Sequence, residues 1–474
     1  MTQTDTVVVI GAGPVGLAAA AHLLERGLKP VVLEAGTQAG SAVRDWGHVQ
    51  LFSPWRFNIA PAARRLLEPR GWVEPDLEAL PSGAQLVEQY LNPLAAALGD
   101  RVQLDSRVVA VSRSGVDKVR TVGRDEHPYL VRVRSSAGEY RDILAKAVID
   151  ASGTWGRNNP LGVAGLAAPG EAEAEEYLAG SLPDVLGRDR ERFAGKHALV
   201  VGMGHSAANT LLALAELART TTGTTVTWAI RAARATRLYG GGDADGLPAR
   251  GALGTRLKEL VDTGAITLIT EFTIDRFERG DGPLSVIGRS ADGQLKLDVD
   301  VVVGATGFRP DLDMLREVRL DLDPGIEAPA QLAPLVDPNF HSCGTVPPHG
   351  ERQLVHPDAG FYIAGMKSYG RAPTFLMATG YEQVRSIAAA LAGDRAAADA
   401  VELDLPETGV CSTDLVAEDS GCCGPAEEPE ASACCPPAAV EPEPAACCGT
   451  APEPVKLGFT TGVEHGYSGD VVRS

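Results

Sequence analysis

Two glycine-rich segments have the residue types and the spacing to hold the diphosphate of a dinucleotide. They place small residues at Gly11, Gly13 and Gly16 in VVVIGAGPVG, and at Gly202, Gly204 and Ala207 in VVGMGHSAA. In such a loop the first glycine permits a tight turn, the second leaves room for a phosphate, and the third position takes a small residue where the helix meets the strand. The N–H groups at the start of the following helix attract the phosphates. The sequence therefore predicts two dinucleotide sites.

Residues beside the loops would complete these sites. Pro14 follows the second glycine of the first loop, and His205 and Ser206 follow that of the second, so all three are candidates for contact with a cofactor. Glu34 ends the next strand, PVVLEAG. A carboxylate at this position, about 20 residues beyond the loop, binds ribose hydroxyls.

In the second site, the strand after the glycine-rich loop ends in a basic residue rather than an acidic one. The strand TTVTWAIR closes with Arg231, and Arg234 follows three residues later. A guanidinium pairs with the 2'-phosphate that a carboxylate would repel. We therefore expect the second site to prefer NADPH, with Arg234 assisting. The alternative is that Arg231 is a solvated residue at the end of a strand.

An alternation of strands and helices must position these loops. Residues 81–98 have the pattern of an amphipathic helix with Ser82 as its N-cap. Residues 101–149 alternate like short strands, and such a layer commonly covers one face of a parallel sheet. A further helix is expected from about Pro373 to Leu391, with its first turn facing a flavin pyrimidine or a phosphate.

Two apolar strands end alike. AVIDASG stops at small residues that include Gly153, and VVVGATG stops at Thr306 and Gly307. Small residues at a strand end allow a close approach of the backbone, so these three are candidates for cofactor contact. One strand lies on each side of the second glycine-rich segment. We expect paired connections between two domains.

The bulk composition excludes some classes of function. The chain has 474 residues, enough for two or three domains, and a formal net charge of −19. A protein this acidic, without a run of Lys and Arg, is not expected to bind nucleic acid or an anionic membrane. No signal segment precedes the first strand and no apolar run is long enough to span a bilayer. The expected location is the cytoplasm.

The eight cysteines are unevenly distributed. Cys343 lies in the part that is expected to fold; it is a candidate catalytic residue, although a buried structural thiol fits it better. Three adjacent pairs lie in a segment rich in Pro, Glu and Ala: Cys422 and Cys423, Cys434 and Cys435, and Cys447 and Cys448. Such a segment is expected to be a disordered linker. Its thiolates could capture a thiophilic metal ion, and the alternative is a low-complexity tail without a role.

A second group of metal-binding residue types lies further upstream. His341, Cys343, His349 and His356 occur within DPNFHSCGTVPPHGERQLVHPD. Their spacing matches no common zinc pattern, and single histidines are more often exposed or hydrogen-bonded in a core. We do not expect a structural metal there.

With two dinucleotide motifs, the chain resembles the two-dinucleotide-binding-domain flavoproteins, in particular the flavin-containing monooxygenases and thioredoxin reductases. The segments RDWGHVQLFSPW, GMGHSAAN, ATGFRPD and GMKSYGRAPTFLMATGYEQVRS are most similar to flavin monooxygenases found with bacterial arsenic-resistance genes. The resemblance implies an α/β fold of two Rossmann-like domains. It places FAD on residues 1–160 and 306–395, NADPH on the inserted residues 161–305, and a tail on residues 396–474.

The chain departs from those families in three places. The histidine of the monooxygenase motif FxGxxxHxxx(Y/F) is missing before the second glycine-rich segment, and the second domain contains no CxxC. The Gly-Asp pair that usually holds the ribityl chain reads Gly365-Met366. These two residues are expected at the flavin, and another group is expected to make the missing contact.

A flavin also needs its edge closed by apolar and hydrogen-bonding groups. Arg44, Trp46 and Ser53 are candidates, because they lie in the aromatic segment after Glu34. The alternative is that Trp46 and Trp55 are anchors of the core.

These observations predict an FAD- and NADPH-dependent oxidoreductase. The resemblance implies hydride transfer to FAD and a flavin hydroperoxide that oxidises a soft nucleophile, such as trivalent arsenic, antimony or a sulfur compound, with molecular oxygen as co-substrate. One alternative is an NADPH-dependent reductase that passes electrons to the tail thiols or a metalloid. Another is a flavoprotein scaffold that sequesters metal. The oligomeric state stays open.

Overall fold

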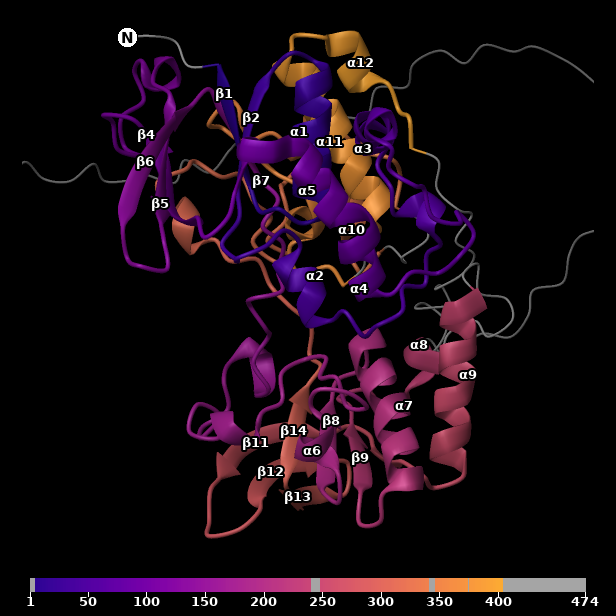
Figure 1. Ribbon diagram of the computed structural model, residues 1–474. Helices are drawn as coiled ribbons and strands as arrows, with labels where there is room; N and C mark the ends of the chain where they lie inside the picture. The colour runs from indigo at the N-terminus through magenta and orange to yellow at the C-terminus, as the bar shows by residue number, and fades with distance from the viewer. Residues whose placement is uncertain (1–4, 240–247, 341–345, 374, 404–474) are drawn as a thin grey trace, which may run out of the picture. The chain divides into compact units, whose positions relative to one another are not determined.

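The computed structural model describes residues 5–239, 248–340, 346–373 and 375–403 (Figure 1). Cys343, His341 and the six paired cysteines of the tail lie outside these residues. No helix within the described ranges is both long and apolar enough to cross a membrane.

The first glycine-rich loop belongs to a parallel sheet in which the described residues form five strands in the order β15-β7-β1-β2-β3. The strands are β1 (Thr6–Ile10), β2 (Lys29–Leu33), β3 (Val102–Gln103), β7 (Ala147–Asp150) and β15 (Phe361–Ile363). The central strand β1 pairs with β2 and β7. Its valines are fully buried, as is typical of a parallel sheet that is covered on both faces.

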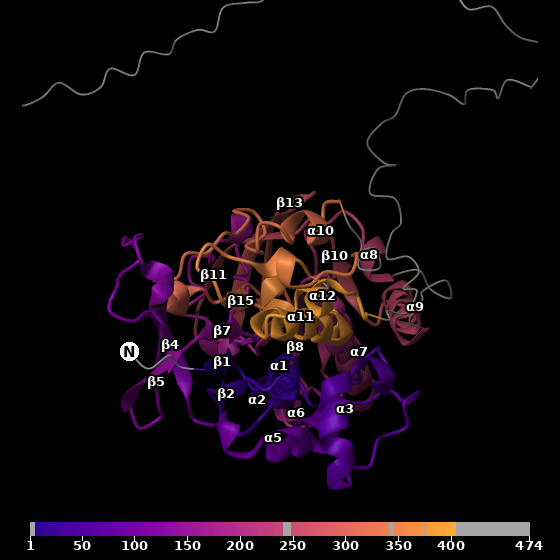
Figure 2. The ribbon, with the colours of Figure 1, turned by 90° about the horizontal axis from the view of Figure 1, so that it is seen from above.

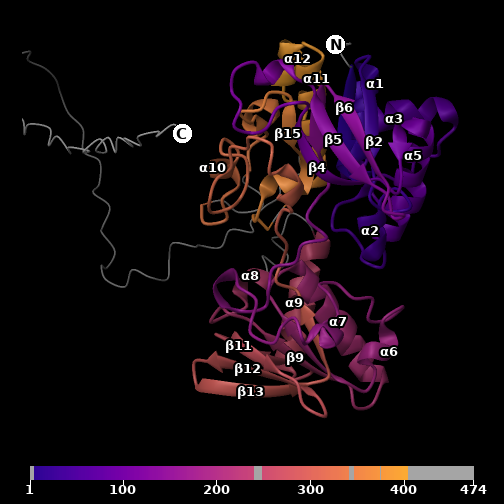
Figure 3. The same ribbon diagram turned by 90° about the vertical axis from the view of Figure 1, so that its left-hand side faces the viewer.

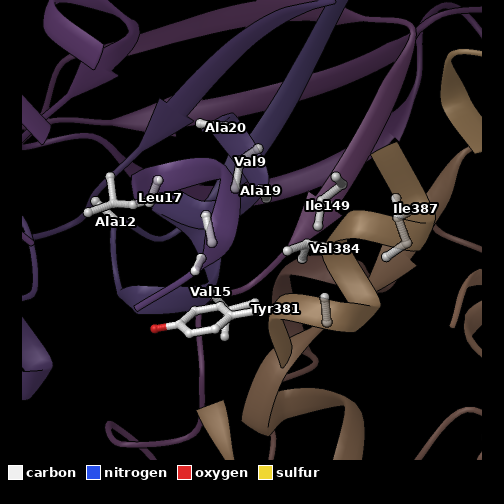
Figure 4. Close-up of a cluster of buried hydrophobic side chains, with 14 of the residues drawn as sticks. Val9, Ala12, Val15, Leu17, Ala19, Ala20, Ile149, Tyr381, Val384 and Ile387 are labelled. Carbon is white, nitrogen blue, oxygen red and sulfur yellow. The ribbon is translucent and has the colours of Figure 1, made fainter. Parts of the chain in front are cut away.

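Helices cover one face of this sheet. They are α1 (Pro14–Glu25), α3 (Pro61–Leu67), α5 (Asn92–Leu98) and α11 (Met377–Leu391). The alanines of α1 allow a close approach, and α1 lies beside α11, far away in the sequence (Figure 2). Val9 and Ile149 of the sheet meet Val384 and Ile387 of α11 in the shared core (Figure 4).

An antiparallel layer covers the other face. It consists of β4 (Arg107–Arg113), β5 (Tyr129–Arg134) and β6 (Tyr140–Ala145), next to β2 in Figure 3. Val111 and Val131 of this layer pack with Val8 and Val148 of the parallel sheet. The expected covering layer is thus confirmed. The last of the strands expected within 101–149 is β7, which belongs to the parallel sheet instead.

The second glycine-rich loop lies in a unit that repeats this plan. Its described strands are β8 (His197–Val201), β9 (Thr225–Ala229), β10 (Thr267–Ile269) and β14 (Val301–Gly304), all parallel, in the order β10-β9-β8-β14. Helices α7 (His205–Thr220) and α9 (Pro248–Asp262) pack on this sheet. An antiparallel layer of β11 (Thr273–Glu278), β12 (Leu284–Ser290) and β13 (Gly293–Val299) packs against it through a separate core. The predicted α/β fold with two Rossmann-like units is confirmed.

The connections between the two units are paired. Asn158 and Phe308 form an antiparallel bridge, and the N–H of Asn159 donates to the carbonyl of Gly307 at 2.9 Å. The two strands that end in small residues therefore lead into adjacent connections, as expected from the sequence.

The helix expected at 81–98 contains an irregular segment. Ser82 is its N-cap and forms a capping box with Gln85. The helix is α4 (Gly83–Leu86), then a wider π-helical turn, Val87–Leu91, and then α5. Because Pro93 has no N–H to donate, the carbonyl of Gln89 accepts a bond from Trp72 Nε1 at 2.7 Å instead. The other short helices are α2 (Ser41–Asp45), α6 (Arg190–Phe193), α8 (Thr236–Tyr239), α10 (Ala333–Val336) and α12 (Arg395–Asp399).

Candidate functional site

The first glycine-rich loop has the shape that a diphosphate requires. Gly11 has φ +97°, and a Cβ there would lie 2.9 Å from the carbonyl oxygen of Ala151. A Cβ on Gly16 would overlap the carbonyl oxygen of Gly11. A Cβ on Gly13 would have nothing within 4 Å. The loop is therefore tight where the chain packs against itself and open where a ligand would lie.

The second loop repeats this geometry. Gly202 has φ +131°, and a Cβ there would overlap the carbonyl oxygen of Ala305. A Cβ on Gly204 would again have nothing within 4 Å. Ala207, at the third position, is fully buried. The residues of both loops thus fit a dinucleotide diphosphate.

Both loops lead into helices whose N-terminal N–H groups are not capped by a side chain. Gly13 is the N-cap of α1, with Pro14 as its first residue, and Gly204 is the N-cap of α7, which begins with His205 and Ser206. Neither first turn contains an acidic residue. The positive end of each helix dipole is therefore free to attract an anion.

Glu34 is held against the first loop. Its Oε2 accepts from the N–H of Ala12 and its Oε1 from the N–H of Gly36, both at 2.8 Å. A carboxylate has about four acceptor sites, so lone pairs remain for the hydroxyls of a ribose. The backbone thus fixes the side chain before any ligand arrives.

The two arginines expected at the second ribose lie just beyond β9. Both are exposed. Glu34 directly follows β2, whereas Ile230 separates Arg231 from β9 and Arg234 lies three residues further along. A guanidinium such as that of Arg231 is the kind of group that pairs with a 2'-phosphate.

The small residues after β7 and β14 differ in their surroundings. Gly153 has φ +70° and open space where its Cβ would lie. Thr306 instead donates its hydroxyl to the carbonyl of Asn159 at 2.8 Å, and Asn159 also lies against Gly307. The structure places Thr306 and Gly307 in the paired connection.

The candidates for closing the flavin edge also differ in their surroundings: one is exposed, and the others have partners within the protein. Arg44 is exposed on α2. Trp46 lies so close to Gly83 that a Cβ there would be 2.8 Å from the indole, and Trp55 is buried in the core. Ser53 donates its hydroxyl to Asn58 Oδ1 at 3.0 Å within its own turn. Trp55 is an anchor of the core, while Trp46 supports a neighbouring turn.

Gly365 and Met366 follow β15 and lie beside the first turn of α1. Gly365 has φ +69°, and a Cβ there would be 3.2 Å from the side chain of Val15. Met366 is half-buried. The following helix α11 begins at Met377 rather than near Pro373, because the chain is still extended at Leu376, with φ −105° and ψ 139°.

A buried hydrogen-bond network holds the turn that contains Gly365, and no sequence pattern indicates it. Gln383 of α11 accepts from the N–H of Gly365 at 2.8 Å and donates to the hydroxyl of Ser368 at 2.9 Å. Gln383 Nε2 also lies 2.9 Å from His349 Nε2, which accepts because His349 Nδ1 bonds to the carbonyl of Pro347. Burial lowers the pKa of His349, so the neutral acceptor form is favoured.

A buried ion pair lies beside this network. Lys367 Nζ bonds to Asp150 Oδ2 at 2.7 Å and to Ser152 Oγ at 3.1 Å. The side chains of Lys367 and Asp150 are both fully buried. This pair also has no signature in the sequence, since its members are 217 positions apart.

The described residues contain no group of three or more His, Cys, Asp and Glu side chains that could hold a metal ion. His349 is hydrogen-bonded in the core, and the Nδ1 atom of the buried His356 accepts from the N–H of Asp321 at 3.2 Å.

A family model described as pyridine nucleotide-disulphide oxidoreductase matches residues 8–343, more than half of the chain. The chain belongs to this family. A curated ferredoxin–NADP reductase of Rickettsia bellii is similar, with 25% identity over 68% of this chain and 79% of its own length.

Two solved structures illustrate the likeness in fold. Bacillithiol disulfide reductase Bdr (YpdA) from Bacillus cereus has a TM-score of 0.61 at 19% identity, over 82% of this chain and 99% of that one. DfoA bound to FAD, the cadaverine monooxygenase of desferrioxamine biosynthesis in Erwinia amylovora, has a TM-score of 0.60 at 15% identity, over 88% of this chain and 100% of that one.

Family membership confirms the expected class of enzyme and its cofactors. The chain is an FAD-dependent, NAD(P)-linked oxidoreductase.

Proposed function

We propose that the protein is an NADPH-dependent flavin monooxygenase that oxidises a soft nucleophile, such as trivalent arsenic, trivalent antimony or a sulfur compound. The observation that carries this proposal is the distribution of cysteine. Residues 1–342, which contain both glycine-rich loops, have no cysteine. They offer no dithiol that could take electrons from a flavin, so the acceptor would come from solution. Molecular oxygen is the acceptor that we propose.

The chain's own residues would bind and orient two nucleotides. A bound FAD supplies the redox chemistry, since it can take an electron pair from NADPH and activate oxygen. The first turn of α1 and Glu34 would hold the FAD diphosphate and ribose. The first turn of α7 would hold the NADPH diphosphate, and Arg231 and Arg234 would pair with its 2'-phosphate.

The entry to α11 would exclude water from the reaction. Phe375 and Tyr369 stack edge to face with their ring centroids 5.0 Å apart, and Phe375 also lies against Gly380. Met377 follows as the first residue of the helix, and its sulfur lies 3.9 Å from the hydroxyl oxygen of Tyr381. We propose that this apolar wall shields the reacting flavin.

The paired cysteines of the tail support a thiophilic substrate. Adjacent thiolates chelate soft ions without a preformed site. We propose that Cys422 and Cys423, with the two later pairs, capture the metalloid and raise its concentration near the enzyme. Cys343 remains a candidate thiol and, like the tail, lies outside the described residues.

A reductase is the second candidate. Its support comes from the relatives, because the Rickettsia bellii protein and the Bacillus cereus structure both carry the name of a reductase. In this case the electrons would pass from the flavin to the tail thiols and then to a metalloid or a disulfide.

One set of assays separates these functions. NADPH oxidation is followed with and without arsenite, in air and without oxygen, together with the oxidation state of the arsenic product. The monooxygenase predicts arsenite-stimulated consumption that needs oxygen and yields pentavalent arsenic. Turnover that persists without oxygen supports the reductase, whereas arsenite binding without turnover supports a sequestering scaffold. Gly204→Ala, which should bind NADPH poorly, is the negative control.

A further inference from the structure

The sequence leaves open which group replaces the carboxylate that is missing at Met366. The turn after β7 and the turn after β15 meet next to the first glycine-rich loop. The Cα of Ser152 would lie 3.0 Å from a Cβ on Gly11, and the turn of Gly365 packs on Val15 at the start of α1. The two turns therefore border the same cradle.

Ser152 is the exposed member of a buried polar group. Its hydroxyl donates to Asp150 Oδ1 at 2.6 Å and accepts from Lys367 Nζ at 3.1 Å. The residue itself is exposed, while Asp150 and Lys367 behind it have no exposed side-chain surface. A hydroxyl has two acceptor lone pairs, so one remains for a ligand donor such as a ribityl hydroxyl.

The ion pair behind Ser152 connects the end of β7 to the turn after β15, and its burial has a cost in free energy. Two charges removed from water lose their hydration, and an apolar pair of similar size is often equally stabilising. Here the pair has an effect that an apolar pair would lack, because Lys367 and Asp150 together fix the position and the hydrogen-bond direction of the Ser152 hydroxyl.

We propose that Ser152 contacts the ribityl chain of FAD in place of the missing carboxylate, and that Lys367 is the positioning residue that holds it there. Lys367 lies next to Met366, so the same contact also sets the turn that Met366 occupies. The inference rests on FAD binding at the first loop, and it assigns a role to residues that do not belong to the glycine motif.

The first test measures FAD binding rather than turnover. Apoprotein is titrated with FAD, and the dissociation constant is obtained from the quenching of flavin fluorescence. Ser152→Ala should raise this constant by about 5- to 10-fold, the range for one lost hydrogen bond. The melting temperature of the apoprotein should fall only slightly, because Asp150 and Lys367 each lose one hydrogen bond but keep the bond to each other.

Ser136→Ala is the matched control. Ser136 is also exposed and also donates its hydroxyl to a carboxylate, Asp105 Oδ2 at 2.8 Å, in the antiparallel layer. The Ser136→Ala variant should bind FAD as tightly as the wild type does. If Ser152→Ala also binds FAD like the wild type, the proposed contact is refuted.

Lys367 needs a test that separates positioning from folding. Lys367→Met leaves Asp150 buried and unpaired, so the apoprotein should melt at a lower temperature and FAD should bind at least 10-fold more weakly. The double variant Asp150→Asn with Lys367→Met removes both charges. It should recover much of the melting temperature but not the FAD affinity. Recovery of both would show that the pair only stabilises the fold and would overturn the positioning role.

A second buried ion pair provides the control for this variant. Arg124 bonds to Asp358 at 2.7 and 2.9 Å, and both side chains are almost fully buried. Arg124→Met should lower the melting temperature without weakening FAD binding, measured well below that temperature. A wild-type protein that takes up no FAD would refute the cofactor assignment itself, which distinguishes that failure from a failure of this inference.

Discussion

The open positions Gly13 and Gly204 allow each nucleotide site to be blocked separately. Both glycines have extended backbones, with φ −79° and ψ −176° for Gly13 and φ −102° and ψ 179° for Gly204. An alanine can adopt these angles, and its Cβ would touch no protein atom within 4 Å. The free energy of unfolding should therefore change by less than about 1 kcal/mol.

The effect on nucleotide binding should be larger. The added methyl group would occupy the space where the diphosphate must approach the backbone, and overpacking of this kind costs about 1–3 kcal/mol. That cost corresponds to a roughly 5- to 150-fold higher Kd. Gly13→Ala should weaken the binding of FAD, and Gly204→Ala should weaken the binding of NADPH. Neither variant should change the binding of the other nucleotide.

The assay is a pair of titrations on each variant, with FAD by flavin fluorescence and with NADP⁺ by calorimetry on the FAD-loaded protein. Gly280→Ala is the control, because a Cβ there also has nothing within 4 Å and the residue lies in the turn before β12. Binding of NADP⁺ by Gly204→Ala as tightly as by the wild type would contradict this prediction, and so would unfolding of Gly13→Ala.

Four further predictions follow from other residues. Arg231→Ala should weaken the binding of NADPH by at least 10-fold and that of NADH only slightly, because a charge-assisted bond to the 2'-phosphate is lost. The KM values for the two cofactors measure this difference. Ser82→Ala should lower the free energy of unfolding by about 1 kcal/mol in urea denaturation, because the bond to the N–H of Gln85 is lost. Burial lowers the pKa of His22 from 6.5 to about 4, so unfolded protein takes up a proton first as the pH falls. The free energy of unfolding should drop by roughly 3 kcal/mol between pH 6.5 and 4, and His22→Leu should abolish this pH-dependent contribution. Truncation after Leu405 should reduce the arsenite bound per chain, measured by equilibrium dialysis, and should leave NADPH oxidation without arsenite unchanged.

Local patterns made part of the structure predictable from the sequence. The spacing of Gly11, Gly13 and Gly16 encodes a turn that only small residues permit, so the loop could be predicted without knowledge of its neighbours. Ser82 with Gln85 is likewise a signal within a single helical turn. In the antiparallel layer, apolar and polar residues alternate along each strand, and this alternation indicates which face of the strand is buried.

Contacts between distant segments could not be predicted in this way. Lys367 meets Asp150 only because β15 and β7 are neighbours in the sheet. Each residue alone appears in the sequence as an ordinary polar residue beside an apolar strand. Pro373 is a common first residue of a helix and predicts an early start of α11, whereas the helix begins at Met377, after Leu376 in an extended conformation.

An anaerobic titration of the purified protein with NADPH would show whether a bound flavin takes electrons from this nucleotide. We expect a yellow protein whose visible flavin absorption is bleached by one equivalent of NADPH and returns when air is admitted. A protein that stays colourless after incubation with FAD would contradict this expectation. A bound flavin whose absorption is not bleached by NADPH would contradict it as well.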